Sequence, residues 1–100
     1  MLALKSCCEN CNKPLPAHAK DARICSFECT FCRSCVENVL QSVCPNCGGD
    51  FQPRPIRPSV NFKNNNFIGQ HPPAYESIYE PVDLVEHQKL VEKVGAIIER

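Results

Sequence analysis

The chain has 100 residues and no formal net charge, because 11 Lys and Arg balance 11 Asp and Glu. This length suggests one domain, and fewer than roughly 70–80 ordered residues seldom fold on a hydrophobic core alone. No apolar run approaches the ~18 residues of a membrane span, and residues 1–8 lack a signal-peptide core. We therefore expect a cytoplasmic protein with reduced thiols and no membrane partner.

Nine cysteines, all within the first 47 residues, dominate the N-terminal half. An odd count and repeated Cys-x-x-Cys pairs suit metal binding better than complete disulfide pairing. The short turn in such a pair lets both sulfurs reach one Zn²⁺ at about 2.3 Å. Eight thiolates complete two tetrahedral zinc sites. The predicted ligands are Cys8, Cys11, Cys25, Cys29, Cys32, Cys35, Cys44 and Cys47. Cysteine thiolates bound to zinc would make the N-terminal half acidic, which argues against a nucleic-acid partner, since phosphate binding needs clustered Lys and Arg.

Local signals around these cysteines predict a turn, a short helix and a small core. Pro45 presets the turn of the last Cys-x-x-Cys pair, and Gly48 lets the backbone curl back with positive φ. Valine and leucine recur at helical steps between Cys35 and Cys44, which predicts a short helix over residues 36–43 with one buried face. The side chains predicted to fill the space between the zinc knuckles are Leu15, Ile24, Phe27, Phe31 and Phe51.

The ligand order, the Cys-Pro-x-Cys closing pair and the short helix before it resemble the RING finger over residues 8–47. The resemblance implies a small, metal-stabilised α+β fold with interleaved sites, a cross-brace. One zinc would then take Cys8, Cys11, Cys32 and Cys35, and the other would take Cys25, Cys29, Cys44 and Cys47. Spacing alone leaves the sequential pairing open, in which the first four ligands share one ion. Cysteine also stands where RING fingers usually place a histidine.

Residues 22–32 and the closing Cys-Pro-Asn-Cys-Gly-Gly also resemble a family of short, uncharacterised, cysteine-rich bacterial proteins, a domain of unknown function. This resemblance runs from about Leu4 to Pro58. It does not cover the rest of the chain, which is called the tail below.

Four further residues resemble ligands but are predicted not to bind metal. Cys7 is the thiol left over, and we expect a free surface thiol; substitution for Cys8 and oxidative pairing with another chain are the alternatives. His18 and His71 lie outside ligand spacing, and His87 falls on a helical stripe.

The C-terminal half is built differently. Residues 1–52 would form the zinc module and residues 53–80 a flexible linker rich in Pro and Asn, which favour extended and turn conformations. Residues 81–100 predict an amphipathic helix, with Asp83 as N-cap and Glu86 completing a capping box. Its apolar stripe comprises Leu84, His87, Val91, Val94 and Ile98, flanked by Leu90 and Ile97. This face would pack on the zinc module, called the finger below, on a second copy of the chain through self-association, or on a partner.

These features predict a non-enzymatic protein whose structural zinc module mediates interaction with an unknown protein partner. Four thiolates leave zinc no position for water or substrate, which argues against catalysis. A ubiquitin-ligase-type RING is one alternative, although Glu9 stands where such ligases have an apolar residue, the chain has no Trp, and Arg54 is the nearest candidate for their arginine after the last ligand. A thiol redox or zinc-reservoir protein is another alternative, and the closing pair would also suit a rubredoxin-like iron site.

Overall fold

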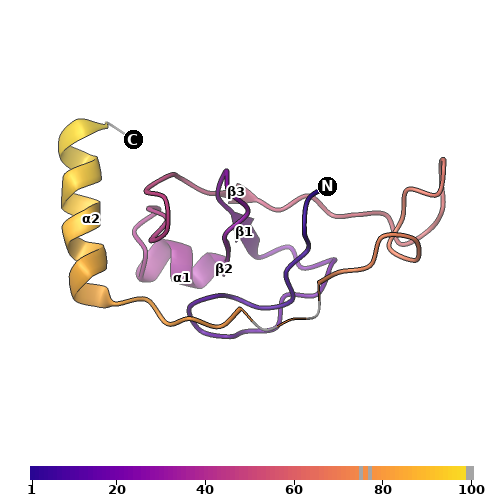
Figure 1. Ribbon diagram of the computed structural model, residues 1–100, viewed down its shortest axis with the longest axis horizontal. Coiled ribbons are helices and arrows are strands. Elements are labelled where there is room, and N and C mark those ends of the chain that lie inside the picture. The colour runs from indigo at the N-terminus through magenta and orange to yellow at the C-terminus, as the bar shows by residue number, and fades with distance from the viewer. Residues whose placement is uncertain (75, 77, 99–100) are drawn as a thin grey trace.

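The computed structural model describes residues 1–74, 76 and 78–98. It is a small α+β fold, elongated to 45 × 25 × 18 Å, as the sequence predicts for its class. Figure 1 shows helix α2 at one end and the loop around residues 58–70 at the other. The elements in chain order are β1 (Ala22–Ile24), β2 (Thr30–Cys32), α1 (Arg33–Asn38), β3 (Gln52–Pro53) and α2 (Leu84–Ile97). Neither helix in the described part of the chain is long and apolar enough to cross a membrane.

A three-stranded antiparallel sheet, in the order β2-β1-β3, lies at the centre of the finger. The β1–β2 hairpin pairs Ala22 with Cys32 and Ile24 with Thr30, so the loop between them carries Cys25 and Cys29. β3 adds to the free side of β1, with Pro53 at the edge, where the absence of an N–H costs no ladder bond. The sheet therefore extends to Pro53.

Helix α1 corrects the predicted helix over residues 36–43. It covers Arg33–Asn38, beginning directly after β2 and ending at the C-cap Val39. Gln41 and Ser42 follow with φ of 53° and 60°, which no α-helix tolerates. The predicted buried face is nevertheless present, because Val36, Leu40 and Val43 are all buried. The apolar spacing thus identified the buried side chains but not the extent of the helix.

The core includes Phe31, Leu15 and Leu40, each almost fully buried, and the ring of Phe51 meets Phe31 edge-on at 5.5 Å. Phe27, predicted to join this core, is instead 75% exposed. It lies in the tight hairpin loop, where its N–H donates to the Cys25 sulfur and Glu28 adopts φ 67°. Only part of the predicted core is therefore confirmed.

The described residues between Arg54 and Asp83 contain no helix and no strand longer than an isolated bridge, yet they remain attached to the finger. Arg54 is 4% exposed and donates to the carbonyls of Lys5, Leu15 and Pro16. After the loop, the chain returns alongside the N-terminal segment (Figure 1), where Ala74 N–H donates to the Leu4 carbonyl at 3.0 Å.

Helix α2 has the predicted N-cap, Asp83, whereas the Glu86 side chain, predicted to complete a capping box, accepts from Lys89 at 3.1 Å. The Asp83 side chain accepts hydrogen bonds from the N–H groups of Val85 and Glu86, which satisfies two free donors of the first turn. The helix ends at Ile97, and residues 99–100 of the predicted range lie outside the described residues. His87 is its one buried residue, with Nε2 2.7 Å from the Leu40 carbonyl. The first of the three alternatives for this helix, packing on the finger, therefore holds around His87.

Candidate metal centres

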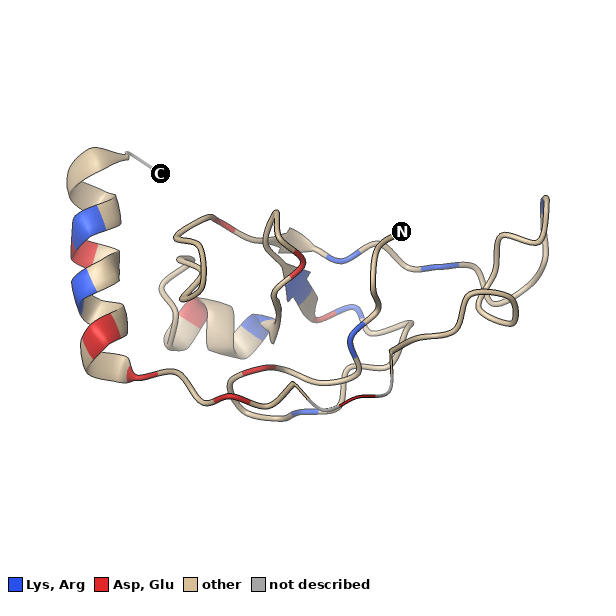
Figure 2. Ribbon diagram, viewed as in Figure 1, with Lys and Arg blue, Asp and Glu red and all other residues tan. Residues whose placement is uncertain are grey.

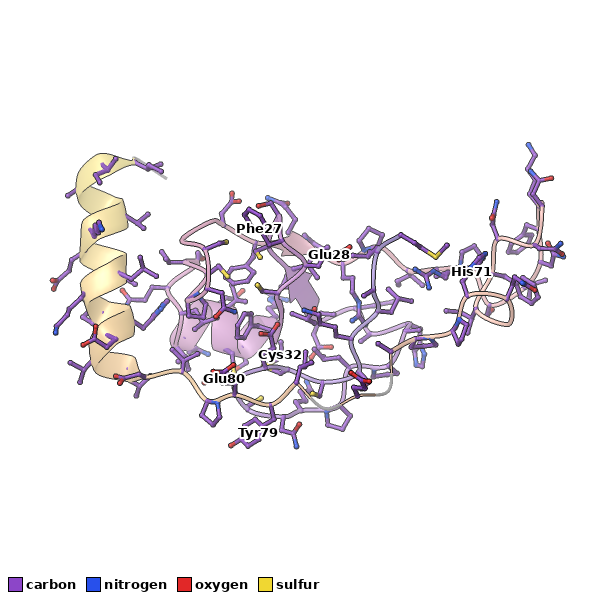
Figure 3. The ribbon with its side chains drawn as sticks, in the orientation of Figure 1. Phe27, Glu28, Cys32, His71, Tyr79 and Glu80 are labelled. Carbon is purple, nitrogen blue, oxygen red and sulfur yellow. The ribbon has the colours of Figure 1, made fainter. Side chains whose placement is uncertain are left out.

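The first group of sulfurs comprises Cys8, Cys11, Cys32 and Cys35, whose Sγ atoms all lie within 4.8 Å of one another. Cys8 and Cys11 belong to a turn that the Asn12 N–H closes onto the Cys8 carbonyl at 2.9 Å. Cys32 ends β2 and Cys35 lies in α1, so the hairpin brings both beside that turn. Figure 3 shows Cys32 among the sulfurs of the finger.

The distances in this group fit zinc. Tetrahedral coordination with Zn–S bonds of about 2.3 Å separates neighbouring sulfurs by about 3.8 Å. The Sγ atoms of Cys11 and Cys32 lie 3.8 Å apart. All nine thiols are free, so the spacing does not reflect disulfide bonds.

The second group comprises Cys25, Cys44 and Cys47, again with all Sγ atoms within 4.8 Å. Cys29 lies beside them, and its thiol interacts with those of Cys25 and Cys44. The turn from Cys44 closes as predicted: Gly48 has φ 77° and its N–H donates to the Cys44 carbonyl at 2.8 Å. The structure thus gives one set of four thiols and one of three plus a neighbour.

The two groups alternate along the chain. Cys25 lies with Cys44 and Cys47, far along the sequence, rather than with Cys8 and Cys11. The described sulfur groups follow the order that the RING resemblance implies and differ from the sequential pairing.

Hydrogen-bond donors surround the sulfurs and would offset the charge of thiolates. Two are backbone N–H groups and two are side-chain amides located inside Cys-x-x-Cys pairs. The four hydrogen bonds run from Phe27 N to Cys25 Sγ (3.3 Å), Gly49 N to Cys47 Sγ (3.3 Å), Asn10 Nδ2 to Cys35 Sγ (3.4 Å) and Asn46 Nδ2 to Cys29 Sγ (3.5 Å). Sequence reasoning did not identify Asn10 or Asn46, whose only signal is their position between paired cysteines.

Burial controls the protonation of these thiols when no ion is bound. It raises the pKa of Cys35 and of Cys44 well above the ordinary thiol value. Burial also acts to raise the pKa of Cys25, but the Phe27 N–H and the neighbouring thiols outweigh it, so that pKa lies below the ordinary value. A bound cation would displace the remaining protons, because thiols bind metal as thiolates.

Each group reaches solvent through a single member, Cys11 in the first and Cys47 in the second. Cys7 belongs to neither group and is buried rather than on the surface. Its backbone pairs with that of Pro14 in an isolated bridge. Neither described group includes His18, His71 or His87.

The tail is hydrogen-bonded to these centres. Asn10, which donates to the Cys35 sulfur, accepts a hydrogen bond from the Val82 N–H at 3.0 Å. Asn46 donates to Glu9 at 3.4 Å, and the Glu9 carbonyl accepts from the Glu80 N–H at 2.7 Å. Asn10 therefore links the Cys35 sulfur directly to the tail, and Asn46 links the Cys29 sulfur to the tail through Glu9.

Comparison with known proteins gives two matches. Residues 1–57 match the family described as "Protein of unknown function (DUF1272)". An uncharacterized protein of Rhizobium meliloti (strain 1021) is 51% identical over 63 residues, which cover 63% of this chain and 75% of that relative. No solved structure matches the chain significantly.

Proposed function

Since the chain belongs to the DUF1272 family, whose description assigns no activity, we propose from its own geometry that it is a non-enzymatic zinc protein whose two closed sites build a rigid surface for a protein partner. The cysteine clusters suggest zinc binding. The cross-brace, the count of two ions and the interaction role are the parts that the proposal adds.

The spacing of the first sulfur group carries this proposal. Four thiols within 4.8 Å, one pair separated by the 3.8 Å edge of a zinc–sulfur tetrahedron, would hold one Zn²⁺. Cys25, Cys44 and Cys47 would hold the second ion, with Cys29 turning in as the fourth ligand. The chain would then pass through both sites twice, which ties the hairpin to the turns at Cys8–Cys11 and Cys44–Cys47.

Closed sites favour a structural role over a catalytic one. When thiolates fill all four positions, no water or substrate reaches the ion, and zinc contributes to folding instead. The small hydrophobic core is consistent with this dependence, since cysteines make up much of it.

Two residues favour an interaction module over a ubiquitin-ligase-type RING. Glu9 accepts a hydrogen bond from the Thr30 N–H at 2.5 Å and lies 3.8 Å from the Lys5 ammonium. This acidic side chain therefore contacts residues of the finger itself. The Arg54 guanidinium is directed into the finger, where it donates to carbonyls, rather than out toward a partner.

Native mass spectrometry of the zinc-loaded chain tests the proposal. We expect two ions in the unaltered chain, one each in Cys8→Ser and Cys25→Ser, and two in the matched control Cys7→Ser. A single ion, iron, or no ion in the unaltered chain would overturn the proposal. Release of zinc by mild peroxide would instead favour the thiol-redox alternative.

A further inference from the structure

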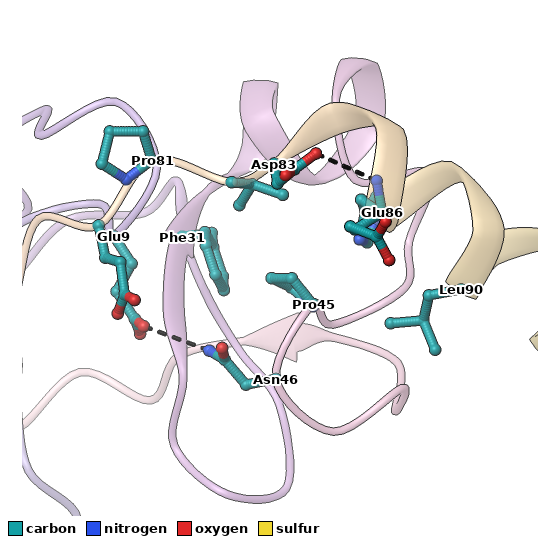
Figure 4. Close-up of a pocket in the computed structure, with 11 residues that line it drawn as sticks. Glu9, Phe31, Pro45, Asn46, Pro81, Asp83, Glu86 and Leu90 are labelled. Carbon is teal, nitrogen blue, oxygen red and sulfur yellow. Dashed lines mark hydrogen bonds between the residues drawn. The ribbon is translucent and has the colours of Figure 1, made fainter.

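A cavity of about 270 Å³ lies between the finger and the start of α2 (Figure 4). Phe31 and Pro45 of the finger and Leu90 of the helix give it apolar walls. In Figure 4, Phe31 and Pro45 lie between Glu9 on one side and Glu86 on the other. Small-molecule sites usually measure roughly 300–1,000 Å³, so this cavity suits a single side chain.

The charge around this cavity is negative. Its described lining includes Glu9, Glu80, Asp83 and Glu86 and no Lys or Arg. Glu9 and Asp83 are engaged by backbone N–H groups, whereas Glu80 has no side-chain partner among the described residues and Glu86 pairs only with exposed Lys89 at 3.1 Å. In Figure 2 the charged residues at the start of α2 are red, and the first blue residue lies farther along the helix.

His87 also lines the cavity and provides independent evidence for a donor ligand. Its Nε2 lies 2.7 Å from the Leu40 carbonyl, which can only accept, so Nε2 carries the proton. In the neutral ring Nδ1 is then an acceptor. This atom is buried and has no partner among the described residues. A buried acceptor without a donor is unfavourable, so a ligand that supplies an N–H group would be favoured at this site.

We propose that this cavity binds the side chain of an arginine in a basic segment of a protein partner. A guanidinium remains charged and presents five N–H donors, so it would face the exposed carboxylates of Glu80 and Glu86 while its apolar stem lies against the cavity walls. A small shift of the buried His87 ring would let the guanidinium donate to Nδ1. The zinc–thiolate sites would add negative charge nearby. This inference rests on the proposed function, because it names the partner chemistry of the surface that the zinc module builds.

An NMR titration of the full zinc-loaded chain tests the inference. The probes are a short Gly/Ser peptide with one central arginine and a matched peptide with citrulline, which keeps the shape and loses the charge. We expect the arginine peptide to shift the ¹⁵N resonance of His87 Nδ1 and the Phe31 amide, and the citrulline peptide to bind about tenfold more weakly or worse. Glu80→Gln with Glu86→Gln should weaken the arginine peptide by a similar factor, whereas Glu92→Gln on the outer face should not.

Two results would overturn the inference: equal binding of the two peptides, or the absence of any shift at His87 and Phe31. A zinc count on the same sample separates this failure from that of the proposed function. Two ions without peptide binding would reject the arginine site alone, whereas fewer than two ions would reject the zinc module itself.

Discussion

The two halves of this molecule are similar in chain length but differ in how they bury side chains. Up to Arg54 the chain encloses a core of 15 buried apolar or cysteine residues, whereas beyond Arg54 only His87 is buried among the described residues. The second half does not lack apolar residues, since Phe62, Leu84 and Ile97 are all largely exposed. The difference shows that gathered cysteines, rather than hydrophobicity alone, decide where so short a chain forms a core.

The halves also differ in what holds them. The finger combines a sheet with two sulfur groups, whereas the tail is attached mainly by hydrogen bonds to the finger, such as those of Val82 and His87. The tail should therefore depend on the finger more than the finger depends on the tail. Four predictions test this contrast, from the largest expected effect to the smallest.

Removal of metal should have the largest effect. Structural zinc contributes roughly 10–16 kcal/mol in small fingers near neutral pH, so a chelator should unfold the finger. Helix α2 should be lost as well, because an isolated helix of 14 residues is marginal in water. Hydrogen exchange before and after chelation measures both effects, and restored protection after zinc addition is the control. Persistent protection of α2 amides in the chelated chain would contradict the dependence of the tail on the finger.

Substitution of the central aromatic side chain comes next. Phe31→Ala removes an almost fully buried ring and should lower the free energy of unfolding by about 3–5 kcal/mol. Phe27→Ala, a matched change at an exposed ring, should stay within about 0.5 kcal/mol. Denaturant unfolding of the zinc-loaded variants provides the measurement. Equal losses would mean that the hairpin loop buries Phe27 after all.

Arg54→Met should have an intermediate effect at the junction of the halves. It removes the donors to three finger carbonyls and should cost on the order of 1–3 kcal/mol in unfolding free energy. Arg33→Met is the control, because Arg33 is exposed and, within the part of the chain that the structure describes, its side chain pairs only with Glu37. If both variants were equally stable in thermal unfolding, the buried guanidinium would not be joining the tail to the finger.

The smallest effect is expected at the start of α2. Asp83→Ala removes the N-cap acceptor and should destabilise the helix by about 1 kcal/mol. Amide exchange should quicken in α2 while the sheet amides keep their rates. Glu92→Ala, an exposed change within the same helix, is expected to leave those rates unaltered, and a uniform change across finger and helix would argue against separate stability of the halves.

Features that depend on local chemistry could be predicted from the sequence. The N-cap Asp83, the positive φ of Gly48 and the buried face of residues 36–43 each follow from a few neighbouring residues. The grouping of sulfurs could not be derived from spacing, because it depends on how the hairpin brings Cys32 beside Cys8. The RING resemblance, rather than spacing, implied the interleaved ligand order, and the cross-brace itself belongs to the proposed function.

The remaining misses have long-range or conformational causes. Arg54 and His87 bond to backbone carbonyls far away in sequence, and a carbonyl has no residue signature. Phe27 is exposed because the loop turns tightly at Glu28, and α1 stops because Gln41 and Ser42 adopt left-handed backbone angles, for which neither residue type has a strong preference.

The single side chain of Asn10 joins a sulfur of the first group to the backbone of the tail. Its two hydrogen bonds are made by one amide, so binding of the proposed ion at Cys35 and ordering of the tail at Val82 would be linked equilibria. Reciprocity requires that each raises the affinity of the other by the same factor. If the proposed zinc is bound there, a partner that pulled the tail from the finger would also lower the affinity of this site for its ion.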